Sequence, residues 1–155
     1  MVKTISQKVF FKATPKKVYE MLMDSDKHSG FTESSAKIHR EVGGRFTAYD
    51  GWIEGDNLEL VPNKRIVQSW RGGNWPEGHY STATFELKAV DDGTNLSFTQ
   101  TNVPDEFYKA ISKGWIEHYW EKMEKNPGKI KNISMCMHKK KILRTCLIII
   151  SSFCL

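Results

Sequence analysis

The clearest pattern in the chain is an apolar residue at every fourth position between residues 103 and 126. The repeating residues are Phe107, Ile111, Trp115, Tyr119 and Met123. At the pitch of an α-helix they form one drifting apolar stripe, and charged residues gather on the opposite side. Pro104 suits a first helical turn, and Asn126-Pro127-Gly128 is a stop signal. The pattern predicts one amphipathic helix of about 30 Å, with Gly114 at a point of close approach between helix and sheet.

The sequence before this helix largely alternates between apolar and polar residues, which is typical of half-buried strands. Ile5, Val9 and Phe11, for example, share one face of the first run. Asp92-Gly93 lies between two alternating runs and is the strongest hairpin signal. We expect strands over residues 3–12, 45–49, 51–61, 65–71, 79–90 and 94–101, with a short strand near residues 36–38.

A short helix is expected directly after the first strand. Thr14 can cap it and Pro15 suits its first position. Its apolar side consists of Val18, Tyr19, Leu22 and Met23. We expect this helix to end in the polar run of residues 24–30.

Short connections between successive strands imply an antiparallel sheet. The order is then a strand, a short helix, a weakly patterned segment, a meander of strands and the long helix. One face of the sheet would pack on that helix. The predicted fold class is therefore a two-layer α+β domain.

The charge of the chain is divided unevenly between a body and a tail. Residues 1–127 carry 17 Lys and Arg against 18 Asp and Glu, whereas residues 128–155 carry six basic residues and no acid. All three cysteines, Cys136, Cys146 and Cys154, lie in the tail. A body without cysteine is no disulfide scaffold, and the first ten residues lack the apolar segment of a signal peptide. We expect one cytoplasmic domain over residues 1–127.

Residues 128–155 combine the basic cluster Lys139-Lys140-Lys141 with a final apolar run. Such a segment could lie on an anionic membrane surface, but its apolar run is too short to span a bilayer. The alternative is an extension with no role in the body, and we favour this interpretation. We expect the tail to be poorly ordered, dispensable for folding and without membrane contact.

No set of residues predicts catalysis. The histidines His28, His39, His79, His118 and His138 are scattered over different predicted elements. No HExxH, CxxC, GxSxG or phosphate-binding loop motif is present. Cys136-Met137-His138 is a lone short cluster in the tail, and we do not interpret it as a metal site. The sequence indicates a protein that is not an enzyme and that has no metal and no cofactor.

The loop at residues 72–79 is the most distinctive predicted surface feature. It places Trp75 among glycines, Pro76 and polar residues, and the presence of a large aromatic side chain in such a loop requires an explanation. One interpretation is a partner-binding hot spot formed by Arg71, Trp75, Pro76, Glu77 and His79. The other is that Trp75 folds back and closes one end of the space between sheet and helix. The sequence leaves both interpretations open.

Aromatic residues are numerous enough to line a cavity between the sheet and the long helix. They are Trp52, Trp70, Phe85, Phe98, Trp115 and Tyr119. A pocket for a small apolar ligand is one interpretation. The other, which we favour, is that these side chains fill the core, because protein interiors are close-packed. Arg45, Lys64, Arg65 and Arg71 could form a basic patch, but the body holds as many acids, so we expect no nucleic-acid partner.

Four segments carry a resemblance to a known family. They are FKATPKKVYEML, GGRFTAYDGWIEGDNLELVPNKRIVQSWR, NWPEGHYSTATFEL and GWIEHYWEKME. Together they resemble the C-terminal domain of the activator of the heat-shock protein 90 ATPase, over roughly residues 3–126. That family belongs to the START-like, helix-grip (Bet v 1-like) superfamily. The resemblance implies a curved antiparallel sheet wrapped on a long C-terminal helix, in agreement with the pattern above.

The resemblance also implies a function and a partner. The chain would be a cochaperone-type module that binds the heat-shock protein 90 chaperone and stimulates its ATPase activity, with a role in protein folding and the stress response. The full cochaperone has a separate N-terminal domain without a counterpart here, and its family ends soon after the long helix. The alternative function is a carrier of a small hydrophobic ligand in the helix-grip cavity. A third, an enzyme of the same superfamily, is disfavoured by the missing catalytic residues.

Overall fold

The structure is a computed structural model, and it describes residues 1–125. The predictions for the tail at residues 128–155, and for the end of the long helix at Asn126, lie outside the described residues. Within residues 1–125, no helix is long and apolar enough to cross a membrane.

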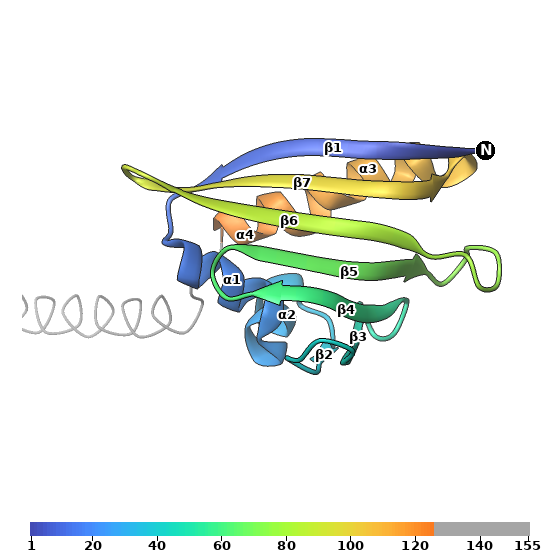
Figure 1. Ribbon diagram of the computed structural model, residues 1–155, viewed down its shortest axis with the longest axis horizontal. Helices are drawn as coiled ribbons and strands as arrows, with labels where there is room; N and C mark the ends of the chain where they lie inside the picture. Colours follow the sequence, from blue (N-terminus) through green and yellow to red (C-terminus); the bar gives the residue numbers. More distant parts are fainter. Residues whose placement is uncertain (126–155) are drawn as a thin grey trace, which may run out of the picture.

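Seven strands form one sheet in which every neighbouring pair is antiparallel (Figure 1). Their order across the sheet is β1-β7-β6-β5-β4-β3-β2. The strands are β1 (Val2–Phe11), β2 (Lys37–Ile38), β3 (Arg45–Ala48), β4 (Ile53–Val61), β5 (Arg65–Gly72), β6 (Ser81–Val90) and β7 (Gly93–Pro104). Every predicted strand is present. The predicted hairpin is confirmed as well, because Val90 pairs with Gly93 across the turn between β6 and β7.

Helices precede and follow the main meander of strands. Two short ones, α1 (Pro15–Met23) and α2 (Ser25–Thr32), connect β1 to β2. The C-terminal helix begins with a 3₁₀ turn (Asp105–Phe107) and continues through α3 (Tyr108–Trp115), a π-helical turn (Ile116–Trp120) and α4 (Glu121–Lys125). The predicted start of this helix at Pro104 is wrong. Val103 and Pro104 remain in β7, where they pair with Lys3 and Val2 of β1.

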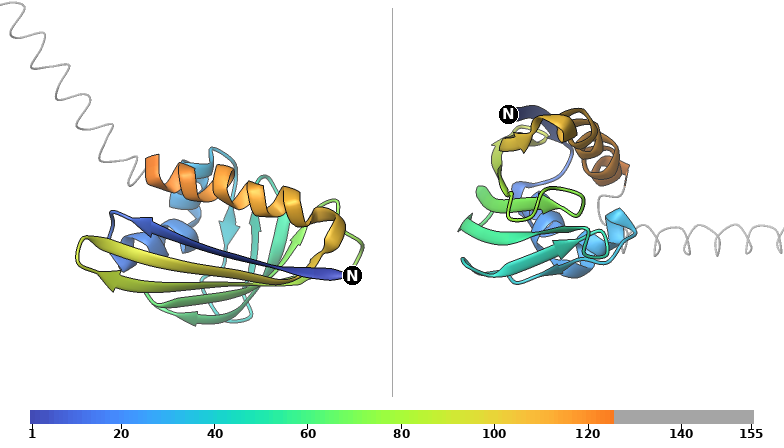
Figure 2. Two further views of the ribbon diagram at one scale, coloured as in Figure 1. Left: turned by 90° about the horizontal axis from the view of Figure 1, so that it is seen from above. Right: turned by 90° about the vertical axis from the view of Figure 1, so that its right-hand side faces the viewer.

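The curved sheet and the C-terminal helix form two layers (Figure 2). The helix crosses the concave face of the sheet, and the sheet curls around it from β1 to β3. The two short helices lie toward the end where α4 stops, and α2 contacts α4. The predicted α+β fold of helix-grip type is confirmed.

Helix α2 was missed by the sequence pattern, which placed only a polar run there. Asp24 caps this helix, its Oδ1 accepting a hydrogen bond of 2.9 Å from the Lys27 backbone N–H. Its core side is formed by His28, Phe31 and Thr32. Two of these three residues are polar, so the segment lacks the apolar stripe by which a helix is recognised.

The core lies between the concave face and the helices. From the sheet, alternate residues such as Phe85, Leu96 and Phe98 point inward, and from the helix Ile111, Trp115, Tyr119 and Met123 point back. Trp120 is also fully in the core, although it does not belong to the every-fourth-residue stripe. The aromatic rings of Trp115 and Trp120 stack with centroids 5.5 Å apart.

Candidate functional site

A pocket of about 550 Å³ opens between α3 and the strands β3–β5. Residues from the turn between β3 and β4 form one side of it, residues from α3 and the π-helical turn form the other, and Trp70 of β5 lies behind them. Its size is within the range of about 300–1,000 Å³ that is usual for small-molecule sites. The lining of the pocket is mostly aromatic and aliphatic.

The floor of the pocket is formed by aromatic side chains held by buried hydrogen bonds. Trp115 Nε1 donates to Gln100 Oε1 at 2.7 Å, and Gln100 Nε2 donates to Ser81 Oγ at 2.8 Å. Ser81 Oγ in turn donates to the Trp70 carbonyl at 2.8 Å. The chain of bonds joins helix to sheet and fixes the Trp115 ring, since each buried polar group in it has its partner.

The helix side of the pocket is open because small residues line it. Ala110 and Gly114 both line the pocket from α3. A Cβ atom added at Gly114 would meet only His118 Cδ2, at 3.8 Å. The prediction of a close approach between helix and sheet at Gly114 is therefore wrong: here the missing side chain leaves space open rather than letting two backbones touch.

The opposite wall turns sharply at three consecutive residues in the left-handed region. The φ angles are 49° at Tyr49, 57° at Asp50 and 90° at Gly51. Two hydrogen bonds hold this turn in place. Asp50 Oδ1 accepts from the Ser35 backbone N–H at 2.9 Å, and the Tyr49 hydroxyl donates to the His118 carbonyl at 2.7 Å. Strained backbone of this kind persists only where the surroundings hold it, and here it joins the sheet to the π-helical turn at the pocket.

Burial changes the acidity of the two tyrosines of this region. It raises the pKa of Tyr49 to about 12. Burial raises the pKa of Tyr119 well above its usual value, and the neighbouring Tyr49 adds to the effect. Both phenols are therefore neutral at physiological pH, and that of Tyr49 is a hydrogen-bond donor to the His118 carbonyl.

The exposed tryptophan of the molecule is Trp52, which lies at the edge of the pocket and is 42% exposed. Its ring covers the backbone of Gly72 and Gly73. A Cβ atom at Gly73 would lie 2.8 Å from Trp52 Cδ1, and one at Gly72 would lie 3.0 Å from Trp52 Cη2. The glycine pair therefore provides the flat surface on which this ring is held.

Trp75, in contrast, folds back under its loop and is only 3% exposed. Its ring stacks on Phe107 with centroids 6.2 Å apart and meets the Trp70 ring at 5.2 Å. The expectation that Trp75 stands clear of the sheet as an exposed anchor is thus wrong, and the alternative, that it closes one end of the interior, is right. The role of the loop in partner binding stays a prediction.

Other residues of that loop fix its shape and form its exposed tip. Arg71 donates to two loop carbonyls, from Nη2 to that of Trp75 at 2.6 Å and from Nε to that of Pro76 at 3.2 Å. The His79 ring contacts the Asn102 carbonyl at 2.8 Å through Nε2. Pro76 and Glu77 are exposed at the tip. The loop is therefore a preorganised surface, which lowers the entropic cost of binding.

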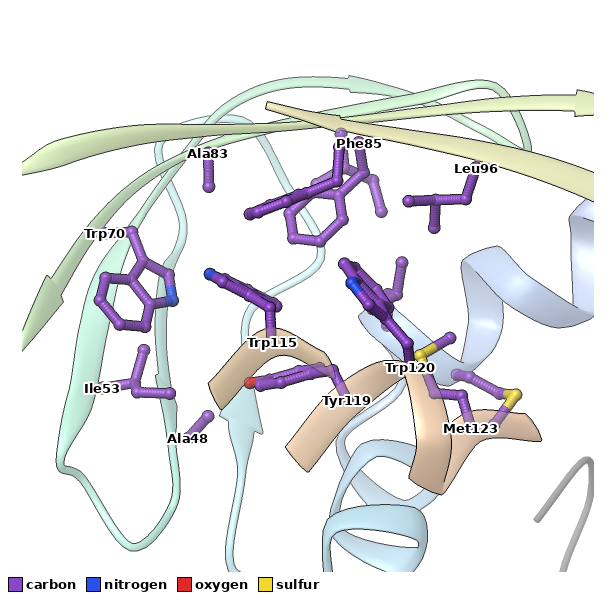
Figure 3. Close-up of a cluster of buried hydrophobic side chains, with 14 of the residues drawn as sticks. Ala48, Ile53, Trp70, Ala83, Phe85, Leu96, Trp115, Tyr119, Trp120 and Met123 are labelled. Atoms are coloured by element: carbon purple, nitrogen blue, oxygen red, sulfur yellow. The ribbon is translucent and has the colours of Figure 1, made fainter. Parts of the chain in front are cut away.

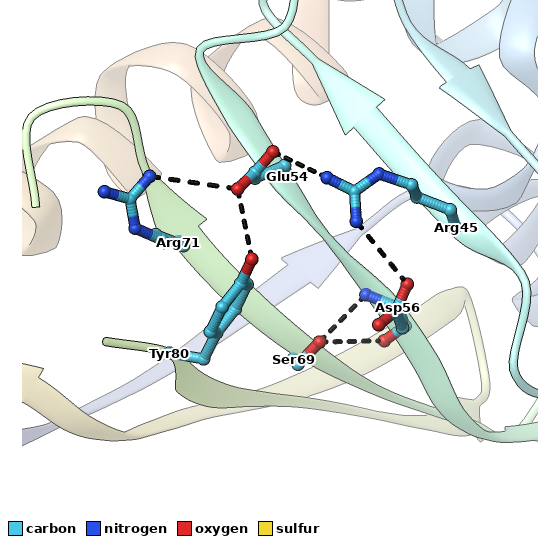
Figure 4. A network of polar contacts seen from close by, with 6 residues as sticks. All are labelled: Arg45, Glu54, Asp56, Ser69, Arg71 and Tyr80. Atoms are coloured by element: carbon cyan, nitrogen blue, oxygen red, sulfur yellow. Dashed lines mark hydrogen bonds and ion pairs between the residues drawn. The ribbon is translucent and has the colours of Figure 1, made fainter. Parts of the chain in front are cut away.

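The face of the sheet away from the helix carries a network of charges (Figure 4). Glu54 is at its centre, 2.7 Å from Arg45 Nη2 and 3.8 Å from Arg71 Nη1, and it accepts from the Tyr80 hydroxyl at 3.1 Å. Arg65 is paired with Glu59 and Glu86. Because each of these three arginines faces an acid, they form no basic patch, as expected from the balanced charge of the body.

The six aromatic residues predicted to line a cavity have different positions. Trp52, Trp70, Trp115 and Tyr119 line the pocket. Phe98 is buried in the filled core, and Phe85 borders only a void of about 20 Å³ beside it. The two phenylalanines therefore do not line the pocket, because their rings, with centroids 5.1 Å apart, pack in the filled part of the core. Figure 3 shows Phe85 in this part of the interior.

The described residues include no cluster of potential metal ligands. Among residues 1–125, no group of three or more His, Cys, Asp or Glu side chains converges. His28 is buried against Phe31 and Tyr119, whereas His39 and His118 are exposed. His79 belongs to the loop described above.

Comparison with known proteins identifies the family. Residues 12–126 match the family model described as Activator of Hsp90 ATPase homolog 1-like protein. The chain belongs to this family. Among curated relatives, a Dictyostelium discoideum protein named as an activator of 90 kDa heat shock protein ATPase homolog is 32% identical over 125 residues. Activator homolog 1 of Homo sapiens is 30% identical over 124 residues. These alignments cover 79% and 80% of this chain but only 32% and 37% of the relatives, so the chain spans about a third of their length.

Solved structures agree on the fold. An HSP90 activator from Plasmodium falciparum superimposes with a TM-score of 0.74 at 24% identity, covering 78% of this chain and 93% of its own. The Aha1 dimer from Colwellia psychrerythraea gives a TM-score of 0.70 at 22% identity, with 80% and 95% covered. At this level of identity the likeness extends to the fold alone.

Sequence reasoning missed one feature of the pocket and one of the adjoining core. Tyr49 was taken only as the end of a strand, although the following Asp50-Gly51 is a turn signal that could have indicated a bend at the pocket. Trp120 was left out of the core because it breaks the every-fourth-residue pattern. Its position five residues after Trp115 is the signal that a wider helical turn lies between them.

Proposed function

We propose that this domain binds a heat-shock protein 90 chaperone and stimulates its ATPase activity, with no catalytic site of its own. The observation that carries this proposal is membership of the activator family over residues 12–126. Stimulation would arise from tighter binding to the ATP-competent conformation of the chaperone than to the others, because a ligand shifts an equilibrium only through such a difference.

We further propose the loop at residues 72–79, with Arg71, as part of the contact. Pro76 and Glu77 are exposed, while Arg71 and His79 fix the loop through backbone carbonyls. Trp75 would contribute from beneath, by holding this shape, and not as an exposed anchor. The neighbouring Trp52 is exposed and rigidly held, so it is the aromatic side chain available to a partner on this edge.

The test uses the full chain with a purified heat-shock protein 90 chaperone, measuring affinity by calorimetric titration and chaperone ATPase turnover in parallel. Glu77→Lys should weaken binding by about tenfold at an unchanged melting temperature, because this side chain is exposed. Asp92→Lys is the matched control, since it makes the same charge reversal on the exposed β6–β7 turn at the far end of the sheet.

Trp75→Ala should lower the melting temperature and the affinity together, because the loop loses its support. If the wild-type chain neither binds the chaperone nor changes its ATPase rate, the proposed function is wrong. If the chain binds but Glu77→Lys behaves like Asp92→Lys, the loop is not the contact. The next candidate is then the exposed side of α3 and the π-helical turn, at Lys109, Lys113 and Glu117.

A further inference from the structure

A second hollow lies at the end of the molecule where the described part of the chain stops. It has a volume of about 280 Å³ and is bounded by the end of β1, by α1 and by the last turn of α4. Figure 1 shows these three elements at the same end of the sheet. Met123 and Glu124 line this hollow, and Lys125 is the last described residue. We call it the end groove.

The end groove has an apolar floor and an aromatic ring at its edge. The floor residues are each at most 8% exposed, and they are Phe11, Val18, Met21 and Met123. Phe10 also lines the groove, and it is 43% exposed. Such a surface can bury further apolar side chains, and no other residue of the described range 1–125 covers it.

The chain itself supplies apolar side chains close to this groove. The turn signal Asn126-Pro127-Gly128 comes directly after Lys125. The apolar residues that follow it are Ile130, Ile133, Met135 and Met137. A chain spans at most about 3.6 Å per residue, so Ile130 lies within about 18 Å of Lys125 and Ile133 within about 29 Å. A short tether gives an effective concentration on the order of millimolar, so modest apolar burial is enough to hold this segment in the groove.

Charges on the rim of the groove favour the same segment. Glu124 lines the groove, and Glu121 lies one turn before it on α4. Both are exposed, and neither forms an ion pair with another residue of the described part of the chain. Lys129 and Lys131 flank Ile130, so a segment lying along α4 brings two cations toward these two acids.

We propose that residues 129–137 fold back after the turn at residues 126–128 and dock in the end groove, with Ile130 and Ile133 on its apolar floor. This departs from the sequence-based expectation that the tail has no role in the body. The more distant apolar run at residues 146–150 is the less favourable occupant, because closing a longer loop costs more entropy.

The first test is a disulfide in the full chain, and it uses the absence of cysteine from residues 1–127. In a Cys146→Ser, Cys154→Ser background, Ala13→Cys places one thiol at the groove, and Cys136 is the other. Oxidation with glutathione disulfide should join the two thiols within one chain. Non-reducing electrophoresis and peptide mass spectrometry follow the rate and identify the bonded pair.

Matched substitutions in the tail separate docking from chance encounters of a tethered chain. The double change Ile130→Asn, Ile133→Asn should slow disulfide formation by about tenfold, because the apolar contacts that hold the segment are lost. The control is Ile148→Asn with Ile149→Asn, which makes the same change in the final apolar run. It should leave the rate unchanged.

The second test needs no introduced thiol. Met21 and Met123 line the groove, whereas Met23 is buried elsewhere, against Gln68, and serves as the internal reference. In the full chain labelled with ¹³C-methyl methionine, the change at residues 130 and 133 should move the NMR signals of Met21 and Met123. The Met23 signal should stay in place, and the control change should move none of the three.

Each outcome decides the proposal. A disulfide within one chain that is slowed by the change at residues 130 and 133, together with shifts at Met21 and Met123, supports it. Equal rates with unmoved methyl signals show a tail that meets the groove only by chance, and they overturn it. Effects of the control change would make the final apolar run the occupant, and a disulfide mainly between two chains would make it a second copy. Either result also overturns the proposal.

Discussion

The interior of this domain has two regions that face the same helix but differ in packing. Beneath β6 and β7, the side chains of Phe85, Leu96, Phe98 and Trp120 fill the space, with Met123 behind them. Beneath β3–β5, the helix leaves a pocket of about 550 Å³. The two regions meet at Trp115, whose ring contacts Phe98 at a centroid distance of 4.4 Å on one side and lines the pocket on the other.

The difference comes from side-chain size, because the sheet and the helix are continuous through both regions. Where the helix presents Trp120 and Met123, the gap is filled, and where it presents Ala110 and Gly114, it stays open. The concave face of one fold can thus be a solid core at one end and an open pocket at the other. Substitutions in the two regions should therefore differ in their effect on stability.

The largest expected effect is the loss of the side chain at the boundary. Trp115→Ala should destabilise the domain by about 3–5 kcal/mol, because this ring is buried and bonded to Gln100. Trp52→Ala, on the open side, should cost less than about 1.5 kcal/mol, since that residue is 42% exposed. Urea unfolding of both variants measures the comparison. A cost below about 1 kcal/mol for Trp115→Ala would show that the stripe it belongs to is not the core.

The second prediction concerns the pH dependence of the free energy of unfolding, and it tests the packing of the core near α2. Burial lowers the pKa of His28 to about 4, and its Nδ1 has no hydrogen-bond partner among the described residues. The folded state therefore holds this ring neutral, while the unfolded chain takes up a proton below about pH 6.5. The stability that the folded state gains from holding His28 neutral is fully present above pH 6.5. It is lost as the pH falls toward 4. The loss there is about 3 kcal/mol.

Urea unfolding at pH 7 and pH 4 measures this loss for the wild type and for His28→Leu. The variant has no proton to take up at this position, so its stability should fall less between the two pH values, by about 3 kcal/mol. Other titrating groups, such as the Glu20–Arg40 pair, contribute equally to both proteins. Equal losses in the two proteins would show that His28 is not the group responsible.

The sequence predicted the fold well because the fold follows from local patterns. Alternation identified the strands, and the Asp92-Gly93 signal located the hairpin, although Gly93 itself pairs with Val90 and the turn lies at Asp91-Asp92. Thr14 caps α1 as expected, its Oγ1 accepting from the Lys17 N–H at 3.3 Å. The four-residue spacing of the apolar stripe is also consistent with the π-helical turn, although no such turn was predicted. Residues spaced by four advance about 40° beyond a full turn at each step of a regular α-helix, and a wider turn takes up part of that drift, which keeps Tyr119 and Met123 facing the core.

The site was harder to predict because it depends on contacts between distant elements. Sequence reasoning left open whether Trp75 is an exposed anchor or a buried plug, and it counted Trp52 among the cavity-lining residues. In the structure Trp75 is buried, and Trp52 is the partly exposed ring. Two contacts determine which ring is exposed. Trp52 packs on Gly72 and Gly73 at the surface, and Trp75 stacks on Phe107 in the interior. Composition of a loop cannot show on which side a neighbouring strand or helix lies.

The smallest expected effect is a gain in stability. It tests whether the small residues of the helix are the reason for the pocket. Gly114 lies within the C-terminal helix, where glycine costs about 1 kcal/mol relative to alanine. Because a Cβ atom there would meet only His118 Cδ2 at 3.8 Å, Gly114→Ala should stabilise the domain by up to about 1 kcal/mol without strain. Gly55→Ala is the control of opposite sign, since its Cβ atom would lie 1.8 Å from the Ser69 carbonyl oxygen in the sheet. Urea unfolding of the two variants should therefore give shifts in opposite directions. Destabilisation by Gly114→Ala would mean that helix and sheet approach closely at this point after all, and that the pocket is narrower than its lining indicates.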